Sequence, residues 1–326
     1  PLPFEARASN RSVEGLPPLA LQQGPSTVTV SGERFDLSLD RTSGHITSWM
    51  FEGRELLLEG PRPNFWRPPT DNDFGGRWQE KLAVWKGAGP GFRAESVTAE
   101  RLGPSEIAIH VVGEVPAGGS AYRIRYRVIG NGEVTVQTHF VPGDEGPPRM
   151  PRFGMQMVLP RELATLTWFG RGPHESYWDR KAGARVRRFT GSVSEQFHPY
   201  VRPQETGNKT DVRWMALTDA DGAGLLVIGD PLFSASALHF TMEDLDGGAS
   251  RGQGHSGELR ERELVTLQVD LRQMGVGGIN SWGPTALPEY SVEYMELRHE
   301  FRLRPFAPSD GGPESLARER FSSSPR

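Results

Sequence analysis

The sequence predicts an all-β protein, a large antiparallel β-sandwich of about a dozen short strands. Three observations lead to this fold class. Apolar and polar residues alternate with a period of two along much of the chain, as they do in half-buried strands. The chain has 39 glycines and 27 prolines among 326 residues, a turn-rich composition typical of many short strands. The only helical pattern covers Gln79 to Lys86, which is one or two turns.

The first strands follow a proline-rich opening. Residues 1–25 show no sustained period, so they read as a linker or as the end of a preceding domain. Val28 and Val30 then alternate with threonines, and a second alternating stretch covers 35–40. The polar turn at 41–44 leads into another apolar stretch at 46–50. We therefore begin the main domain at residue 26.

The clearest hairpin runs from Tyr122 to Phe140. Its apolar side chains at 122, 124, 126 and 128 share one face, while the arginines at 123, 125 and 127 share the other. Gly130-Asn131-Gly132 makes the turn, because glycine and asparagine tolerate positive φ. Further strands are expected at 107–111, 163–169, 225–229 and 264–271, and no repeat of fixed period indicates a propeller or solenoid. We expect the main domain to end at 305 and the polar residues 306–326 to form a disordered tail.

Charge and composition exclude several classes of function. Lys and Arg number 37 against 41 Asp and Glu, and the resulting net charge of −4 argues against general binding to nucleic acid or to an anionic membrane. The absence of cysteine excludes disulfides and thiolate metal sites. No apolar run reaches the ~18 residues that span a bilayer. The chain lacks an initiator methionine, so we expect its true N-terminus, with any targeting signal, to be missing.

The sequence shows no local motif for a metal or a nucleotide. Its eight histidines are scattered without H-x-H or H-E-x-x-H spacing, and no glycine-rich loop opens a helix. We therefore expect neither a metal site nor a cofactor in this chain.

Three segments combine aromatic rings with Asp, Asn, Arg and Glu, namely 64–75, 168–180 and 273–284. This combination suits carbohydrate, because a sugar stacks its C–H face on a ring and pairs its hydroxyls with polar groups. A structural interpretation stays open for the first two segments, in which Arg67 would pair with Asp71 or Asp73, and Arg180 with Glu175 or Asp179. Trp282 lies between small and turn-forming residues, which favours presentation by a loop as much as a structural role.

Unaided catalysis has a few candidate pairs. Glycoside hydrolysis needs two carboxyl groups about 5–5.5 Å apart for retention or about 6.5–9.5 Å for inversion. Sugar mutarotation needs an acid and a base such as histidine and glutamate. The pairs with suitable residue types are Asp71/Asp73, Asp244/Asp246, His174/Glu175 and His198/Glu205.

Four ordered motifs carry a family resemblance. They are FWRPPTDNDFG (65–75), WFGRGPHESYWDR (168–180), PYVRPQETGNKTDVRW (199–214) and GGINSWGP (277–284). In this order they resemble the C-terminal domain, the small chain or fifth domain, of β-galactosidases of glycoside hydrolase family 2, over residues 27–304. The resemblance implies a β-supersandwich with a galactose mutarotase-like fold. Residues 1–25 would then end an immunoglobulin-like β-sandwich.

The same resemblance implies a function. The chain would be part of an enzyme that hydrolyses terminal β-D-galactose residues from substrates such as lactose. In the family, both catalytic glutamates lie on an upstream (β/α)₈ barrel, and magnesium and sodium also belong to that part. This chain would therefore hold no catalytic residue and would be inactive alone, with the upstream domains as partners. A cytoplasmic location is the family expectation, and a homo-oligomer is compatible with it.

One residue role carries over. Trp282 aligns with the family tryptophan that reaches the active site and stacks on the substrate, mainly at its aglycone side. Ile279 departs from the family pattern, which usually has aspartate there, and isoleucine cannot make the side-chain hydrogen bonds by which an aspartate would orient the loop. A stand-alone carbohydrate-binding module and a mutarotase-like epimerase remain the alternative functions.

Overall fold

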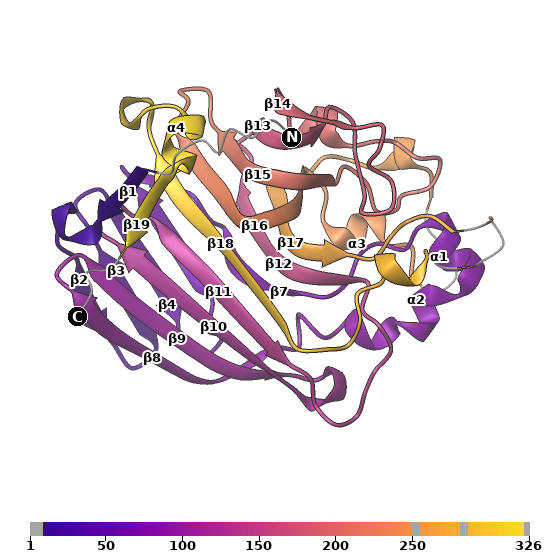
Figure 1. Cartoon of the computed structure of the whole chain (residues 1–326), viewed down its shortest axis with the longest axis horizontal. Coiled ribbons are helices and arrows are strands. Elements are labelled where there is room, and N and C mark those ends of the chain that lie inside the picture. Colours follow the sequence, from indigo (N-terminus) through magenta and orange to yellow (C-terminus); the bar gives the residue numbers. More distant parts are fainter. Residues whose placement is uncertain (1–8, 249–253, 279, 281–283, 285, 323–326) are drawn as a thin grey trace.

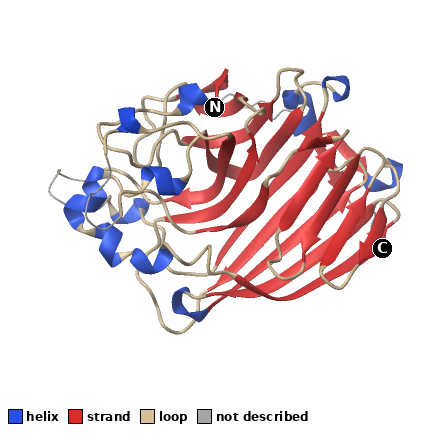
Figure 2. Cartoon of the chain, turned by 180° about the vertical axis from the view of Figure 1, so that it is seen from behind, coloured by secondary structure: helices blue, strands red, loops and turns tan. Residues whose placement is uncertain are grey.

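The computed structural model describes residues 9–248, 254–278, 280, 284 and 286–322. It confirms an all-β fold with antiparallel sheets (Figure 1). Seen from behind, strands form one broad curved surface, and loops with short helices gather at one end (Figure 2).

The large sheet has twelve strands, and its main path runs β14-β13-β15-β16-β18-β11-β10-β9-β8. The long strand β16 also pairs with β17, which continues through β12 to β7. The strands are β7 (Glu59–Asn64), β8 (Arg93–Gly103), β9 (Glu106–Val115), β10 (Ser120–Ile129), β11 (Val134–Val141), β12 (Arg152–Pro160), β13 (Thr165–Gly172), β14 (Arg185–Ser192), β15 (Lys209–Thr218), β16 (Gly224–Leu238), β17 (Leu264–Gln273) and β18 (Leu297–Phe306).

A smaller sheet and short helices complete the fold. The five-stranded sheet is β2 (Ala20–Gln23), β3 (Thr27–Ser31), β4 (Phe35–Asp40), β5 (Ile46–Phe51) and β6 (Arg54–Glu55), and β1 (Ser9–Ser12) pairs in parallel with β19 (Glu319–Ser322). The α-helices are α1 (Asp71–Gly76), α2 (Trp78–Lys81), α3 (Met242–Leu245) and α4 (Pro313–Ala317). Single 3₁₀ turns are η1 (Val13–Gly15), η2 (Ala83–Trp85), η3 (Ala117–Gly119), η4 (Ser194–Gln196), η5 (Ser256–Glu258), η6 (Pro288–Tyr290) and η7 (Pro308–Asp310).

The main core joins the small sheet to the inner face of the large one. Alternating residues of β3 and β4 are buried, and they share one apolar cluster with the inward residues of β9, β10 and β11. Tyr126 of β10 is fully buried, and its hydroxyl donates to the carbonyl of Pro61 at 3.4 Å. Each such apolar side chain contributes about 1.5–3 kcal/mol on burial, so the period-two pattern is what holds the sheets together.

The predicted hairpin is confirmed as β10 and β11. Tyr122 lies opposite Phe140, and the four apolar residues of the predicted face are buried. Gly132 has a φ of 88°, the positive value that the turn requires. Asn131 adds a side-chain bond, since its Oδ1 accepts from the backbone N–H of Glu133 at 3.0 Å.

The predicted helix at 79–86 divides into α2 and the 3₁₀ turn η2, and α1 directly precedes it. Thr70 begins α1 with a capping box, because its hydroxyl accepts from the N–H of Asp73 while the Asp73 carboxylate accepts from the N–H of Thr70. This cap fixes the first motif at the end of the molecule where the short helices gather.

The expectation of a disordered tail is wrong for residues 306–322. Leu316 and Ala317 of α4 are buried in a second apolar cluster with Trp214 of β15 and Phe306 of β18. Arg302 of β18 donates to the carbonyl of Glu319 at 2.9 Å. The polar tail therefore orders because it buries two apolar side chains and supplies acceptors to the outer face of β18.

The opening residues also join the fold, because β2 pairs with β3 of the small sheet. The expected start of the main domain at residue 26 thus falls within this hairpin. An immunoglobulin-like domain ending within 1–25 stays a prediction. No helix among the described residues is both long and apolar enough to cross a membrane.

Candidate functional site

The four sequence motifs meet at the end of the molecule that carries α1. Arg67 reaches from the first motif to the residues just before the fourth, where its guanidinium donates to the carbonyls of Met274 and Gly275, the latter at 3.1 Å. The third motif meets the first, because the N–H of Glu205 donates to the carbonyl of Pro68 at 3.3 Å. Segments more than 200 residues apart thus form one site.

Arg67 is the centre of this arrangement. It is 1 % exposed, and its Nη2 donates to both carboxylate oxygens of Asp73 at 3.0 and 3.1 Å. Asp73 is the same residue that completes the α1 capping box. The structural interpretation of the first motif is therefore confirmed, with Asp73 as the partner of Arg67. Asp71 instead accepts from Nε2 of Gln204 at 3.1 Å.

A buried ionic cluster of Arg152, Glu205 and Asp270 lies next to the site. Arg152 of β12 donates to Glu205 at 2.9 Å, and its Nε lies 3.2 Å from the carboxylate of Asp270 on β17. All three side chains are almost entirely buried. Burial raises the pKa of Asp270 to about 7 against the opposing effect of Arg152, and burial likewise raises the pKa of Glu205. One cation thus serves two buried acids.

A cavity of about 180 Å³ opens beside this cluster. Tyr177, Tyr200 and Arg180 line it, and Asp71 and Gln204 complete its polar wall. Tyr177 is buried, and its hydroxyl has no hydrogen-bond partner within the described part of the chain. Burial raises the pKa of this hydroxyl well above its ordinary value. Aromatic and polar groups therefore meet here, in the combination expected for carbohydrate.

The second motif holds the start of the fourth. Asp179 accepts from the N–H of Val276 at 3.1 Å and from the N–H of Gly277 at 2.7 Å. Asn72 of α1 donates its Nδ2 to the carbonyl of Val276 at 3.2 Å. Trp282 itself lies outside the described residues, so its predicted role stays a prediction. The stem that leads to it, at 274–278, is described.

Neither histidine–glutamate pair forms. The ring Nδ1–H of His174 donates to the backbone carbonyl of Glu175 at 2.9 Å, and the Glu175 carboxylate accepts from Arg180, Tyr200 and the N–H of Gly207 instead. The predicted ion pair of Glu175 with Arg180 is confirmed.

The remaining pairs are also engaged elsewhere. The ring of His198 stacks edge-on with Tyr200, while Glu205 binds Arg152. Asp244 pairs with Arg262, and Asp246 lies 2.7 Å from Nζ of Lys86. Each acid proposed for unaided chemistry thus has another partner. Among the described residues, no group of three or more His, Asp or Glu side chains could hold a metal ion.

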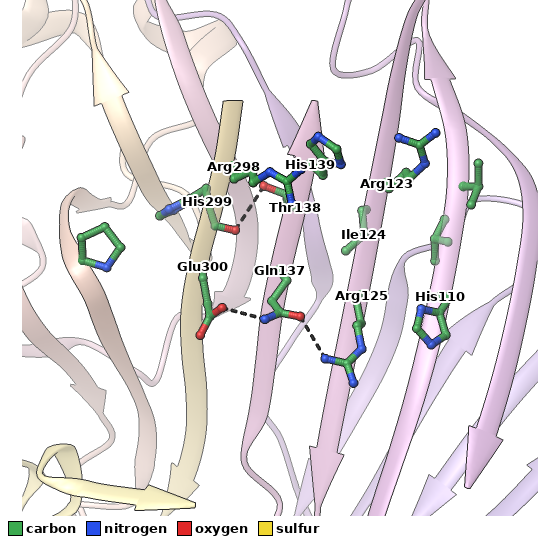
Figure 3. A pocket seen from close by; sticks show the side chains of 13 residues that line it. His110, Arg123, Ile124, Arg125, Gln137, Thr138, His139, Arg298, His299 and Glu300 are labelled. Carbon is green, nitrogen blue, oxygen red and sulfur yellow. Dashed lines mark hydrogen bonds between the residues drawn. The ribbon is translucent and has the colours of Figure 1, made fainter. Parts of the chain in front are cut away.

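A wider groove, about 530 Å³, lies on the outer face of β9, β10, β11 and β18 (Figure 3). Arg125 donates to Gln137 at 3.0 Å, and Gln137 donates to Glu300 at 2.7 Å, so a polar row crosses three strands (Figure 3). The lining residues include arginine and histidine but no Phe, Tyr or Trp. The groove therefore lacks the rings on which a sugar would stack.

Sequence reasoning missed Arg152 and Asp270. Both lie in strands that are buried on both faces, where a charged residue is rare unless it is paired. The signal in the sequence was that each of these mostly apolar stretches contains a charged residue, which indicates a buried ion pair. The partner of each charge depends on the pairing of β12 with β17 and could not be read from either strand alone.

The fold and the site together define a β-supersandwich domain in which side chains of the sequence motifs hold the stem of a loop at one end. Residues 31–304 match the family described as the beta galactosidase small chain. The chain belongs to this family, which confirms the resemblance found in its motifs.

Full-length relatives extend well beyond this chain. A β-galactosidase of Priestia megaterium is 37 % identical over 304 residues, which cover 92 % of this chain and 28 % of that protein. A β-galactosidase of Lactobacillus delbrueckii subsp. bulgaricus is 32 % identical over 270 residues, covering 82 % of this chain and 26 % of that protein. The chain thus spans little more than a quarter of the length of these two relatives.

Solved structures show weaker overall similarity. A galactose mutarotase related enzyme from Lactobacillus acidophilus has a TM-score of 0.47 and 8 % identity, covering 86 % of this chain and 97 % of that one. A galactose 1-epimerase from the same organism has a TM-score of 0.44 and 8 % identity, covering 89 % of this chain and 98 % of that one.

Proposed function

We propose that this chain is the C-terminal part of a β-galactosidase and that it completes the substrate pocket through Trp282. The enzyme would release terminal non-reducing β-D-galactose from substrates such as lactose. The observation that carries this proposal is that side chains of the first two motifs bind the backbone of the stem that leads to Trp282. Membership of the small-chain family supports it.

The chemistry of glycoside hydrolysis determines which groups the catalytic domain must supply. Retention requires two carboxyl groups about 5–5.5 Å apart that are free to act as acid and nucleophile. The acidic side chains of the described motifs are instead engaged with arginine, lysine, glutamine or backbone groups. In line with this, the family resemblance assigns the catalytic glutamates, with the magnesium and sodium of the enzyme, to upstream domains. This chain would bind the substrate and exclude water beside the reacting bond.

Hydrolysis of o-nitrophenyl β-galactoside tests the proposal. We expect no activity from the purified chain alone and activity when it is combined with the upstream domains. Activity of the chain alone would refute the proposal, because an acid pair within this chain would then be catalytic. Calorimetry with lactose should show only very weak binding to the isolated chain, and tight binding would instead favour a stand-alone carbohydrate-binding module.

Trp282→Ala in the whole enzyme tests the role of the tryptophan. A lost stacking contact should weaken substrate binding by about 1–3 kcal/mol, seen as a higher KM. Leu287→Ala is a suitable control, because Leu287 is an exposed residue five positions further along the chain. Unchanged KM and kcat in Trp282→Ala would contradict the role.

The setting of the enzyme completes the proposal. We expect a cytoplasmic enzyme in which the upstream domains are the principal partners and in which copies can form a homo-oligomer. Cell fractionation and light scattering of the whole enzyme measure these two properties. Recovery of the activity outside the cytoplasmic fraction would contradict the expected location.

A further inference from the structure

We propose that Asp179 is a positioning residue for the loop that carries Trp282. This inference rests on the proposed function, because it concerns the same site. Asp179 belongs to the second motif, and both of its carboxylate oxygens bind backbone N–H groups of the stem at 274–278. Oδ1 accepts from Val276 at 3.1 Å, and Oδ2 accepts from Gly277 at 2.7 Å. Gly277 precedes Trp282 by only five residues.

The two bonds fix the direction of the stem. In an extended strand, successive residues present their backbone groups to opposite sides, so one carboxylate cannot bind two consecutive N–H groups without a local turn. A carboxylate that accepts from two such groups makes charge-assisted bonds, which are stronger than neutral ones. Asn72 holds the same peptide from its other side through the carbonyl of Val276. Side chains thus bind three consecutive backbone groups of the stem, namely the N–H and C=O of Val276 and the N–H of Gly277.

The glycines of the stem make room for this contact. A Cβ on Gly275 would lie 2.5 Å from Oδ2 of Asp179, and it would also lie 2.7 Å from the Cβ of Ala286. A Cβ on Gly277 would lie 3.0 Å from the same oxygen, and the Asp179 carboxylate is all that it would meet within 4 Å. Replacing Gly277 by alanine would therefore disturb the contact with Asp179 while leaving the Asp179 side chain in place.

The base of the loop is narrow. A Cβ on Gly278 would lie 2.4 Å from the carbonyl oxygen of Pro284, so the outgoing and returning chains approach closely at these two residues. Gly275 is held in addition, because its N–H donates to the carbonyl of Tyr290 at 2.9 Å. With Gly275 and Gly278 both held, the bonds of Asp179 and Asn72 fix the Val276–Gly277 peptide, and the chain continues from there towards Trp282.

The experiment is a double-mutant cycle in the whole enzyme that carries this chain. KM and kcat for o-nitrophenyl β-galactoside are measured for Asp179→Ala, Gly277→Ala, Trp282→Ala and their pairs. Asp179→Ala should raise KM on the order of tenfold, as expected for loss of hydrogen bonds to a charged group. Gly277→Ala should raise it less, and it should add nothing once Asp179 is alanine. Asp179→Ala should likewise add little once Trp282 is alanine.

Two controls separate positioning from a general loss of stability. Asp310→Asn removes the charge from another partly buried carboxylate that binds a backbone N–H, that of Ala307 in the C-terminal segment, and it should leave KM unchanged. Gly277→Ala removes no side-chain group, so it keeps the test valid even if Asp179→Ala folds poorly. Thermal unfolding of each variant reports stability independently of KM.

The outcomes distinguish the two proposals. If Trp282→Ala leaves the kinetics unchanged, the proposed function fails, and the positioning role falls with it. If Trp282→Ala raises KM but Asp179→Ala does not, the proposed function stands and the positioning role is refuted. Full additivity of Asp179→Ala with Trp282→Ala would also refute it, because the two residues would then act separately.

Discussion

Replacing Arg152 by methionine should destabilise the fold strongly. Methionine is unbranched and can fill part of the same space, but it leaves Glu205 and Asp270 without their shared cation. Arg152 is 1 % exposed, and its nitrogens lie 2.9 Å from Glu205 and 3.2 Å from Asp270. The change therefore leaves two almost entirely buried acids without their cation.

The magnitude follows from the burial of all three groups. Removing one partner of a buried ion pair costs about 3–5 kcal/mol, which is a large part of the ~5–15 kcal/mol by which domains are stable. The cost should depend on pH. Burial already raises the pKa of both acids, so without Arg152 the folded state binds protons that the unfolded state has released. The loss of stability should therefore be largest above pH 7 and should shrink as the pH falls towards 4.

Urea unfolding of the chain, followed by tryptophan fluorescence at pH 5 and at pH 8, measures this effect. Arg262→Met is the matched control, because Arg262 is 53 % exposed and its pair with Asp244 should contribute only about 0–1 kcal/mol. An Arg152→Met loss no larger than that of the control would refute the reasoning. A loss that is equal at the two pH values would refute the electrostatic account of it.

Two further predictions concern acid stability and the C-terminal segment. Burial lowers the pKa of His299 to about 4 from 6.5, so the unfolded state binds the proton first and stability should fall as the pH drops from about 6.5 to 4. His299→Leu should reduce this slope in urea unfolding, and a slope equal to that of the unchanged chain would contradict the prediction. Leu316→Ala should cost about 2–5 kcal/mol, because Leu316 is 3 % exposed. The exposed Leu287→Ala should stay within about 0.5 kcal/mol, and a similarly small effect at Leu316 would show that the C-terminal segment does not stabilise the fold.

The strands could be predicted because their information is local. In β10, the alternation from Tyr122 to Val128 assigns one face to the core and the arginines to the other. Gly132 fixes the turn, and the turn sets the register with β11. A slip of one residue would turn the arginines into the core, so the pattern permits only one pairing.

The site could be predicted only in part, because its contacts join distant segments. The motifs identified the segments that form the site. The pairing of Arg67 with Asp73 could be listed as one of two options, because the two residues are only six positions apart. The contact of Asp179 with the stem spans nearly 100 residues and depends on how β13 and β17 are placed within the large sheet. The ordered segment at 306–322 was missed for a similar reason. Its two buried side chains are too few to show a period, and their partners lie on β15 and β18.

The charged side chains of the site are better explained by the backbone groups that they bind than by a contribution of their ion pairs to the free energy of unfolding. A buried ion pair is often no more stabilising than apolar side chains of the same volume. Arg67, however, also donates to the carbonyls of Met274 and Gly275, and an apolar replacement would leave these two groups without their donor, at about 1–3 kcal/mol for each buried acceptor. Asn72 binds the next carbonyl, and Asp179 binds the following N–H groups. Side chains of the first two motifs therefore hold every residue of the stem from 274 to 277, which gives a physical reason for the occurrence of these motifs together with the loop of Trp282.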